Sequence, residues 1–249
     1  MLIEFSVANF RSLCDRQTFS LMKAVGGELV DTNTFKAVAS TEFDLLRSAA
    51  IYGPNAGGKS NFLGALGAMR AVVLESATSQ KRGDKLPVAS FRLSRATRDA
   101  PSEFEVTFIV NQVRYQYGFS ASTGRIHGEW LLAFPKGRRQ RWVDRAWNER
   151  TQSYDWELGS NLAGEKQLWQ KSTRDNALFC PQLCSSTADN CGRSMTGSIT
   201  PCGRQAGQAG TRDSARHCAK RARKSKSWIF CEPPICTSTI SWLSAHLST

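Results

Sequence analysis

The sequence predicts an α/β fold for residues 1–179, and three patterns support this. Near the N-terminus, Ile3, Phe5 and Val7 alternate with polar residues, which is the period of a half-buried strand. A glycine-rich turn at residues 53–58 is followed by a stretch whose apolar residues recur at helical spacing. Further alternating stretches lie between residues 104 and 143. These patterns indicate a sheet packed against a helix that begins at the glycine turn.

The expected elements can be placed along the chain. We expect strands at residues 3–7, 17–21, 45–51, 104–110, 113–119, 126–134 and 140–143, and helices at residues 59–74 and 162–171. Residues 26–41 and 80–84 are expected to be loops, and Asn111-Gln112 is expected to turn the chain between two strands. We expect a mixed sheet that is incomplete, because no later parallel strands cover the strand at residues 45–51. Such a sheet would expose an apolar edge and tend to aggregate.

Residues 53–60 match the pattern G-x-x-x-x-G-K-[ST] of a phosphate-binding loop, or P-loop. Glycines let successive N–H groups turn into one concavity, and the following helix adds free amides and the positive end of its dipole. Lys59 is expected to contact the β- and γ-phosphates of ATP or GTP, and the Ser60 hydroxyl to bind Mg²⁺. The expected nucleotide-binding residues of the loop are Gly53, Pro54, Asn55, Ala56, Gly57, Gly58, Lys59 and Ser60.

Two motifs together carry a family resemblance. Asn9-Phe10-Arg11-Ser12 after the first strand, with the loop from Ile51 to Asn61, resembles the standalone prokaryotic AAA-type ATPases with an ABC-like head, relatives of the RecF, SMC and overcoming-lysogenisation ATPases. The resemblance covers residues 1–179. It implies a P-loop NTPase fold, ATP and Mg²⁺ as ligands, and hydrolysis of ATP by a head-to-head homodimer of the intact protein. It also implies that Asn61 and Arg11 lie near the nucleotide, although Arg11 equally fits a surface arginine in a turn.

The resemblance leads us to expect two further motifs that the sequence does not contain. In these ATPases an Asp-Glu pair at the end of an aliphatic strand supports Mg²⁺ and orients the attacking water, and this sequence has no Asp-Glu dipeptide. For the Leu-Ser-x-Gly-type signature, the nearest string is Leu93-Ser94-Arg95-Ala96, which lacks the glycine. No catalytic residue is therefore assigned. Two alternatives to an ATPase stay open: a remnant that binds nucleotide without hydrolysing it, and a basic module that binds nucleic acid.

The composition changes abruptly after Phe179. Seven of the eight cysteines lie in residues 180–249, which carry nine Lys or Arg and three Asp or Glu, so this tail holds +6 of the net charge of +12. The cysteines include no C-x-x-C pair of the kind found in zinc sites, and a disulfide framework fits poorly with a chain that shows no secretion signal. The basic run from Lys220 to Lys226 fits either a nucleic-acid-binding arm or an unstructured segment.

A single lost base explains the change in composition. If one base is restored after the Phe179 codon, the neighbouring reading frame can encode stretches with the apolar spacing of an ATPase helix. The sequence therefore predicts an ATPase domain at residues 1–179, followed at residues 180–249 by an aberrant tail that is out of frame and largely unstructured. DNA maintenance or phage defence is suggested as the process only by analogy with the relatives.

Other features bear on location and partners. There is no run of about 18 apolar residues and no signal-peptide pattern, so we expect a cytoplasmic protein without a membrane partner. Lys136 and the cluster Arg138-Arg139-Gln140-Arg141 fit either a contact with nucleic-acid phosphates or a solvated hairpin edge. We expect the tryptophans to pack in the core rather than to stack on bases; they are Trp130, Trp142, Trp147, Trp156 and Trp169.

Overall fold

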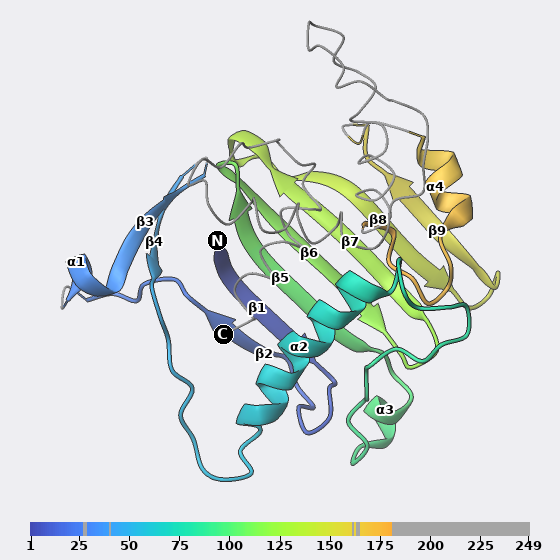
Figure 1. The fold of residues 1–249 in the computed structure, drawn as a ribbon, viewed down its shortest axis with the longest axis horizontal. Helices are drawn as coiled ribbons and strands as arrows, with labels where there is room; N and C mark the ends of the chain where they lie inside the picture. The colour runs from blue at the N-terminus through green and yellow to red at the C-terminus, as the bar shows by residue number, and fades with distance from the viewer. Residues whose placement is uncertain (27–28, 40, 161, 163–164, 181–249) are drawn as a thin grey trace, which may run out of the picture.

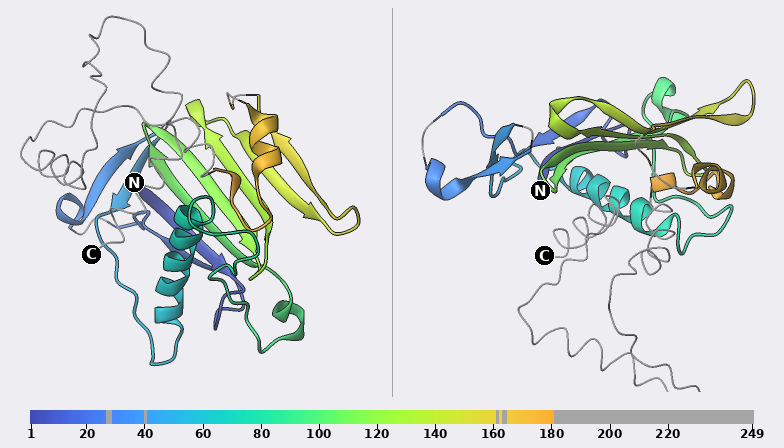
Figure 2. Two further views of the ribbon diagram at one scale, coloured as in Figure 1. Left: turned by 45° about the vertical axis from the view of Figure 1, so that its right-hand side comes forward. Right: turned by 90° about the horizontal axis from the view of Figure 1, so that it is seen from above.

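The computed structural model describes residues 1–26, 29–39, 41–160, 162 and 165–180. The tail expected at residues 180–249 therefore lies outside the described residues, except for Cys180. In the described part, a large sheet carries helix α2 (Lys59–Glu75) across one face, and a small two-stranded sheet lies at one side (Figures 1 and 2). The α/β class that the sequence predicts is confirmed.

The large sheet has seven strands in the order β2-β1-β5-β6-β7-β8-β9. Their bounds are β1 (Leu2–Ala8), β2 (Gln17–Ser20), β5 (Ser102–Val110), β6 (Val113–Ala121), β7 (Ile126–Phe134), β8 (Gln140–Asn148) and β9 (Ser153–Leu158). Every recorded strand pair is antiparallel, which differs from the mixed sheet expected from the sequence. The reason is that β5 to β9 follow one another through short hairpins, and a short hairpin permits only antiparallel pairing.

The turn expected at Asn111-Gln112 is present between β5 and β6. Both residues have positive φ, 47° and 60°, as a type I′ turn requires, and Val110 pairs with Val113 on either side of them. Asn tolerates this left-handed conformation better than most residues do. The turn therefore fixes the register that places alternate residues of both strands in the core.

The main core lies between α2 and the sheet. Helix α2 spans residues 59–75, close to its expected range, and buries one side of its surface through Ala65, Ala68, Met69, Val72 and Val73. Phe62, near its start, meets Phe5 of β1 edge-on with a centroid separation of 5.4 Å. Trp142 and Trp156 pack against Tyr115 and Phe179, which agrees with the expectation that the tryptophans are packing residues.

The region before the glycine turn differs from expectation. Part of the expected loop at residues 26–41 forms a short helix, α1 (Val30–Asn33), and a strand, β3 (Thr34–Val38), which pairs with β4 (Glu42–Leu46) to make the small sheet. The strand expected at residues 45–51 ends at Leu46, and Ile51 and Tyr52 are 38% and 90% exposed. A strand needs a neighbour for its N–H and C=O groups, and among the described residues no strand pairs with residues 47–52.

The last described residues return to the sheet. After β9 comes helix α4 (Lys166–Ser172), within the region where a helix was expected, and the chain then crosses the core face of β7 and β8. Glu129 accepts hydrogen bonds from the N–H groups of Phe179 and Cys180, at 2.7 and 2.9 Å, and Arg145 donates to the carbonyl of Ala177 at 2.8 Å. The side chains of Glu129 and Arg145 are fully buried and lie 3.8 Å apart.

Two short helices remain: α3 (Arg95–Arg98), in the connection between α2 and β5, and the 3-10 helix η1 (Pro135–Gly137), in the connection between β7 and β8. None of the helices in the described part of the chain is long and apolar enough to span a membrane.

Candidate functional site

The start of α2 has the geometry of an anion-binding turn. Gly58 caps the helix with φ of 86°, a conformation that favours glycine, and its carbonyl accepts the first helical hydrogen bond from the Phe62 N–H at 2.9 Å. The N–H groups before Phe62 therefore have no helical acceptor. At Gly57 a Cβ atom would lie 2.9 Å from the carbonyl oxygen of Pro54, so the tightness of this turn depends on glycine. The turn thus directs free amides toward the mouth of the helix.

Lys59 closes the loop from the helix side. Its Nζ donates to the carbonyl oxygens of Gly53 and Pro54, at 2.8 and 2.7 Å. The Lys59 side chain therefore reaches from the first residue of α2 back to the beginning of the loop. The ammonium is thereby held at the centre of the turn, beside the free amides. Ser60 is exposed at the helix start.

The turn between β1 and β2 braces the phosphate-binding loop. Asn61 Nδ2 donates to the Ser12 hydroxyl at 2.7 Å, and a Cβ at Gly58 would lie 3.2 Å from Leu13 Cδ2. Sequence reasoning assigned Asn61 to the nucleotide and did not identify Ser12 or Leu13. The signal was present, since both residues adjoin or belong to the Asn9–Ser12 motif. Here the Asn61 side chain binds the protein itself.

Arg11 lies against the side of α2, and its expected contact with the nucleotide stays a prediction. Its guanidinium stands over the Phe10 ring at 5.1 Å, and its NH1 atom would be 3.2 Å from a Cβ at Gly64. Gly64 follows Gly58 by six residues, which is about 9 Å along a helix axis. The structure therefore brings Lys59, Ser60 and Asn61 together at the loop and places Arg11 at the side of α2.

Asn9 of the same motif makes four hydrogen bonds to a distant segment, which the sequence did not predict. We call this contact the Asn9 latch. Its Nδ2 donates to the carbonyls of Thr97 and Ala100, both at 2.9 Å, and to that of Pro101 at 3.2 Å, while its Oδ1 accepts from the Phe91 N–H at 2.9 Å. One side chain thus ties the turn beside the loop to the connection that contains α3.

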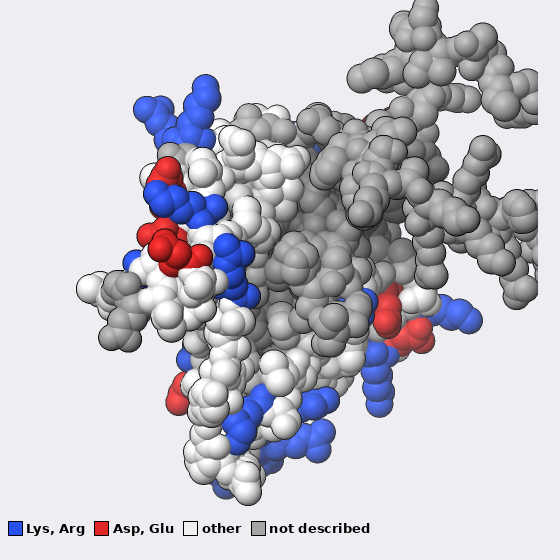
Figure 3. All heavy atoms as spheres, turned by 60° about the vertical axis from the view of Figure 1, so that its left-hand side comes forward, with Lys and Arg blue, Asp and Glu red and all other residues white. Residues whose placement is uncertain are grey.

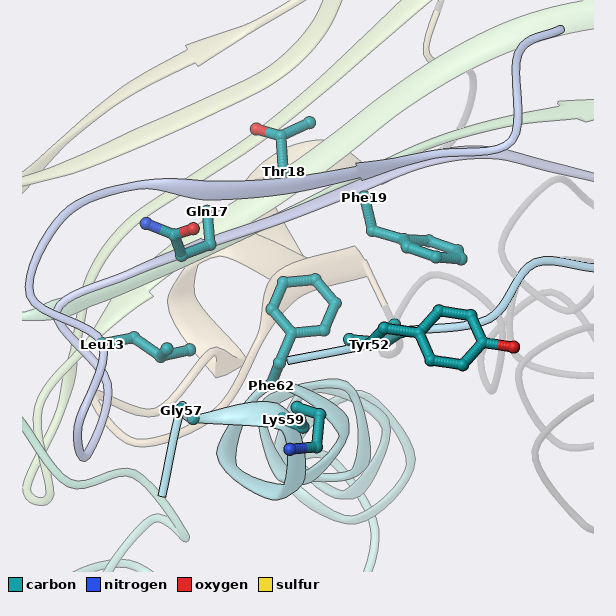
Figure 4. A pocket seen from close by; sticks show the side chains of 10 residues that line it. Leu13, Gln17, Thr18, Phe19, Tyr52, Gly57, Lys59 and Phe62 are labelled. Carbon is teal, nitrogen blue, oxygen red and sulfur yellow. The ribbon is translucent and has the colours of Figure 1, made fainter. Parts of the chain in front are cut away.

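A pocket of about 200 Å³ opens between β2 and the start of α2. Phe19, Tyr52 and Phe62 line one part of it, and Lys59 stands at its lower border (Figure 4). The other lining residues are Leu13, Gln17, Thr18, Ile51, Gly57 and Gly58, so none of the ten is Asp, Glu or His. The pocket therefore joins an aromatic wall to a cationic, amide-rich turn.

Lys and Arg side chains are more numerous than Asp and Glu at one end of the molecule. In Figure 3 they project at the lower end of the view, the end that carries the chain entering α2 in Figure 1, and acidic side chains are visible only at its margins. Positive charge at the mouth of a pocket raises the local concentration of anionic ligands. Among the described residues, no group of three or more His, Cys, Asp or Glu side chains could hold a metal ion by itself.

Comparison with known proteins identifies an AAA domain that includes the phosphate-binding loop. Residues 48–178, more than half of the chain, match a family described as "AAA domain, putative AbiEii toxin, Type IV TA system". A search of curated proteins found no match. The match begins just before the phosphate-binding loop and ends two residues before the last described residue. The chain therefore belongs to this family of AAA-domain, P-loop ATPases.

Proposed function

We propose that this protein binds ATP together with Mg²⁺ at residues 53–61. The observation that carries the proposal is the convergence of the Lys59 ammonium and the free amides at the start of α2 within one turn. Lys59 contacts the β- and γ-phosphates after exchanging its bonds to two loop carbonyls for bonds to phosphate oxygens. The amides bind the remaining oxygens, and Ser60 supplies a hydroxyl ligand to Mg²⁺.

The aromatic wall of the pocket supports a place for the base. Phe19, Tyr52 and Phe62 lie on the β2 side of Lys59, where a nucleobase joined to bound phosphates could rest on a ring face (Figure 4). Tyr52 is largely exposed, so it is free to rotate over a ligand. Asn61 and Ser12 act by holding the loop against the β1–β2 turn, and Arg11 is proposed as a more distant contact.

We also propose that this chain binds ATP but hydrolyses it only very slowly. Hydrolysis needs a group that orients the attacking water, and no carboxylate or imidazole lines the pocket. In an intact relative, the missing groups would come from later residues and from the second subunit of a homodimer. The parent activity is then cytoplasmic ATP hydrolysis coupled to a defence or DNA-related process.

Binding of a fluorescent ATP analogue to the purified chain tests this function. Lys59→Ala should weaken binding at least 10-fold, because one charge-assisted contact to phosphate is worth about 1.5–3 kcal/mol. The matched control is Lys85→Ala, which removes an exposed lysine from a loop outside the pocket and should leave the affinity unchanged. Equal binding by both variants would refute the assignment of the loop, and steady release of phosphate by the wild-type chain would refute the proposal of slow turnover.

The domain boundary is a related proposal. We propose that residues 1–179 form the N-terminal part of the ATPase domain and that residues 180–249 are read out of frame. The end of the family match at residue 178 and the change in composition after Phe179 support this. Sequencing the gene tests it. If the neighbouring frame beyond codon 180 does not encode an amphipathic, ATPase-like continuation, the proposal is wrong.

A further inference from the structure

The hairpin between β7 and β8 is the most basic turn in the described part of the chain. Its residues 134–139 include Lys136, Arg138 and Arg139, all exposed, and no acidic residue. The turn is closed by a hydrogen bond from the Arg138 N–H to the Pro135 carbonyl at 3.2 Å, and Gly137 has φ of 77°. The backbone that carries these three cations is therefore held in one conformation.

A fourth cation comes from the neighbouring strand. Arg114 of β6 pairs with Phe134 across the sheet, and its guanidinium stands over the Phe134 ring at 4.0 Å. Such a contact orients a long side chain that would otherwise be free to move. Arg114 thus adds its charge to the same end of the sheet as Lys136, Arg138 and Arg139. We call these four residues the basic hairpin.

Carboxylates near the basic hairpin are already engaged. Arg141, at the start of β8, forms ion pairs with Asp144 and Glu157. Among the described residues, no carboxylate lies within ion-pair distance of Arg114, Lys136, Arg138 or Arg139. Strands β7 and β8 are each paired on both sides within the sheet, so these four cations are not needed to protect an exposed strand edge.

We propose that the basic hairpin binds the phosphate backbone of nucleic acid. Three exposed cations on the turn and the half-buried Arg114 on the neighbouring strand suit a repeating, closely spaced anion, and arginine matches phosphate oxygens with two parallel N–H groups. The antiparallel register puts this hairpin at the end of the strands opposite the Asn9–Leu13 turn, which braces the phosphate-binding loop. A nucleic acid there would leave the nucleotide pocket accessible, so the two activities can be measured separately.

The test is the salt dependence of binding to a short fluorescent DNA duplex, measured by anisotropy with the full chain. Each phosphate contact contributes about 0.9 to the slope of log K against log salt, so four contacts weaken binding roughly 100-fold between about 50 and 200 mM salt. The variant Arg138→Gln/Arg139→Gln should lower the slope by about two and reduce that loss to roughly 10-fold. Its Tm should stay close to that of the wild type, because exposed substitutions rarely change stability by more than about 0.5 kcal/mol.

The matched control is Arg150→Gln/Lys171→Gln, which removes the same charge from two exposed sites outside the basic hairpin. Both variants are also compared in a background with Gln at Lys220, Arg221, Arg223 and Lys224, so that the basic run of the tail does not hide the effect. The proposal is wrong if the two double variants change the slope equally, or if the wild-type chain does not bind the duplex at low salt. It is also wrong if the hairpin variant loses binding only to phosphatidylserine vesicles, since the partner would then be a membrane.

Discussion

Two segments of this protein adjoin the same sheet-and-helix core, and they differ in what holds them. The return segment, residues 174–180, is bound to β7 and β8 by the buried Glu129–Arg145 pair and to the end of α2 by a bond from the Leu178 N–H to the Ser76 hydroxyl. The approach segment, residues 47–58, enters α2 without a strand partner in the described residues. A segment is fixed by the acceptors and apolar surface that its neighbours supply, and only the return segment has both.

The surface beside the approach segment is apolar. A hollow of about 430 Å³ lies along the flank of α2, lined by Ala49, Ile51 and a set of core-edge residues that comprises Leu2, Phe5, Phe19, Lys59, Ser60, Phe62, Leu63 and Leu66. Leu63 is 60% exposed there. The exposed apolar sheet edge that the sequence leads us to expect stays a prediction. The contrast between the two segments leads to four predictions, from the largest expected effect to the smallest.

Breaking the buried pair should have the largest effect on stability. Glu129→Ala leaves the Arg145 charge and two N–H groups without their acceptor, so we expect a loss of about 3–5 kcal/mol in the free energy of unfolding. Arg141→Met, on the same strand as Arg145 but partly exposed, should cost at most about 1 kcal/mol. Urea unfolding followed by tryptophan fluorescence measures both. Equal losses would show that burial does not distinguish the two ion pairs.

Removing the Asn9 latch should have the next largest effect. Asn9→Ala removes four hydrogen bonds to backbone groups and keeps a positive φ of 52° that alanine adopts with strain, so we expect a cost of about 2–3 kcal/mol. Asn9→Gly removes the strain and isolates the hydrogen bonds, and it should be the less destabilising variant. If ATP-analogue binding weakens with Asn9→Ala under conditions where the protein is folded, the latch also orients the loop. An unchanged Tm for both variants would refute its structural role.

The approach segment should tolerate truncation. Ile51→Ala should change the free energy of unfolding by less than about 1 kcal/mol, because Ile51 is already 38% exposed. Ile126→Ala, at the fully buried start of β7, should cost about 2–5 kcal/mol. The two isoleucines thus form a matched pair for urea unfolding. A large loss at Ile51 would mean that the approach segment is packed as firmly as the sheet.

Acid should weaken the β7 region slightly. Burial, followed by the nearby charge of Arg125, lowers the pKa of His127 below its ordinary value of 6.5, so the folded state favours the neutral ring. The resulting stability is present above about pH 6.5 and is lost as the pH falls through the lowered pKa. His127→Gln should flatten the dependence of Tm on pH in this window. If the wild-type and variant curves run parallel below pH 6.5, His127 does not contribute.

The strands and the helix that could be predicted are those whose partners are near in sequence. The alternation in residues 104–134 and the Asn111-Gln112 turn specify neighbouring hairpin strands, and the spacing after Lys59 specifies α2. The small sheet was missed because residues 26–41 have little periodicity. The strand expected at residues 45–51 was placed by its apolar content alone, which does not reveal whether a partner strand exists.

The candidate site likewise has a part that the sequence predicted and a part that depends on contacts between distant segments. The phosphate-binding loop was fully visible in the sequence, because glycine, lysine and serine at fixed spacing have a local geometric reason. The contributions of Ser12, Leu13 and Asn9 depend on contacts between segments about 50 to 90 residues apart, such as the Ser12–Asn61 and Asn9–Ala100 hydrogen bonds.

The sequence by itself determined the α/β class and the helix after the glycine turn, because periodicity and turn chemistry act within a few residues, and it predicts the residues that hold phosphate. Only the tertiary structure decided that the described sheet is antiparallel, that Arg11 lies along the side of α2, and that Glu129 and Arg145 share a buried site. The physical reason is that pairing and burial depend on which distant segments meet, and a local sequence pattern does not specify which distant segment it will contact.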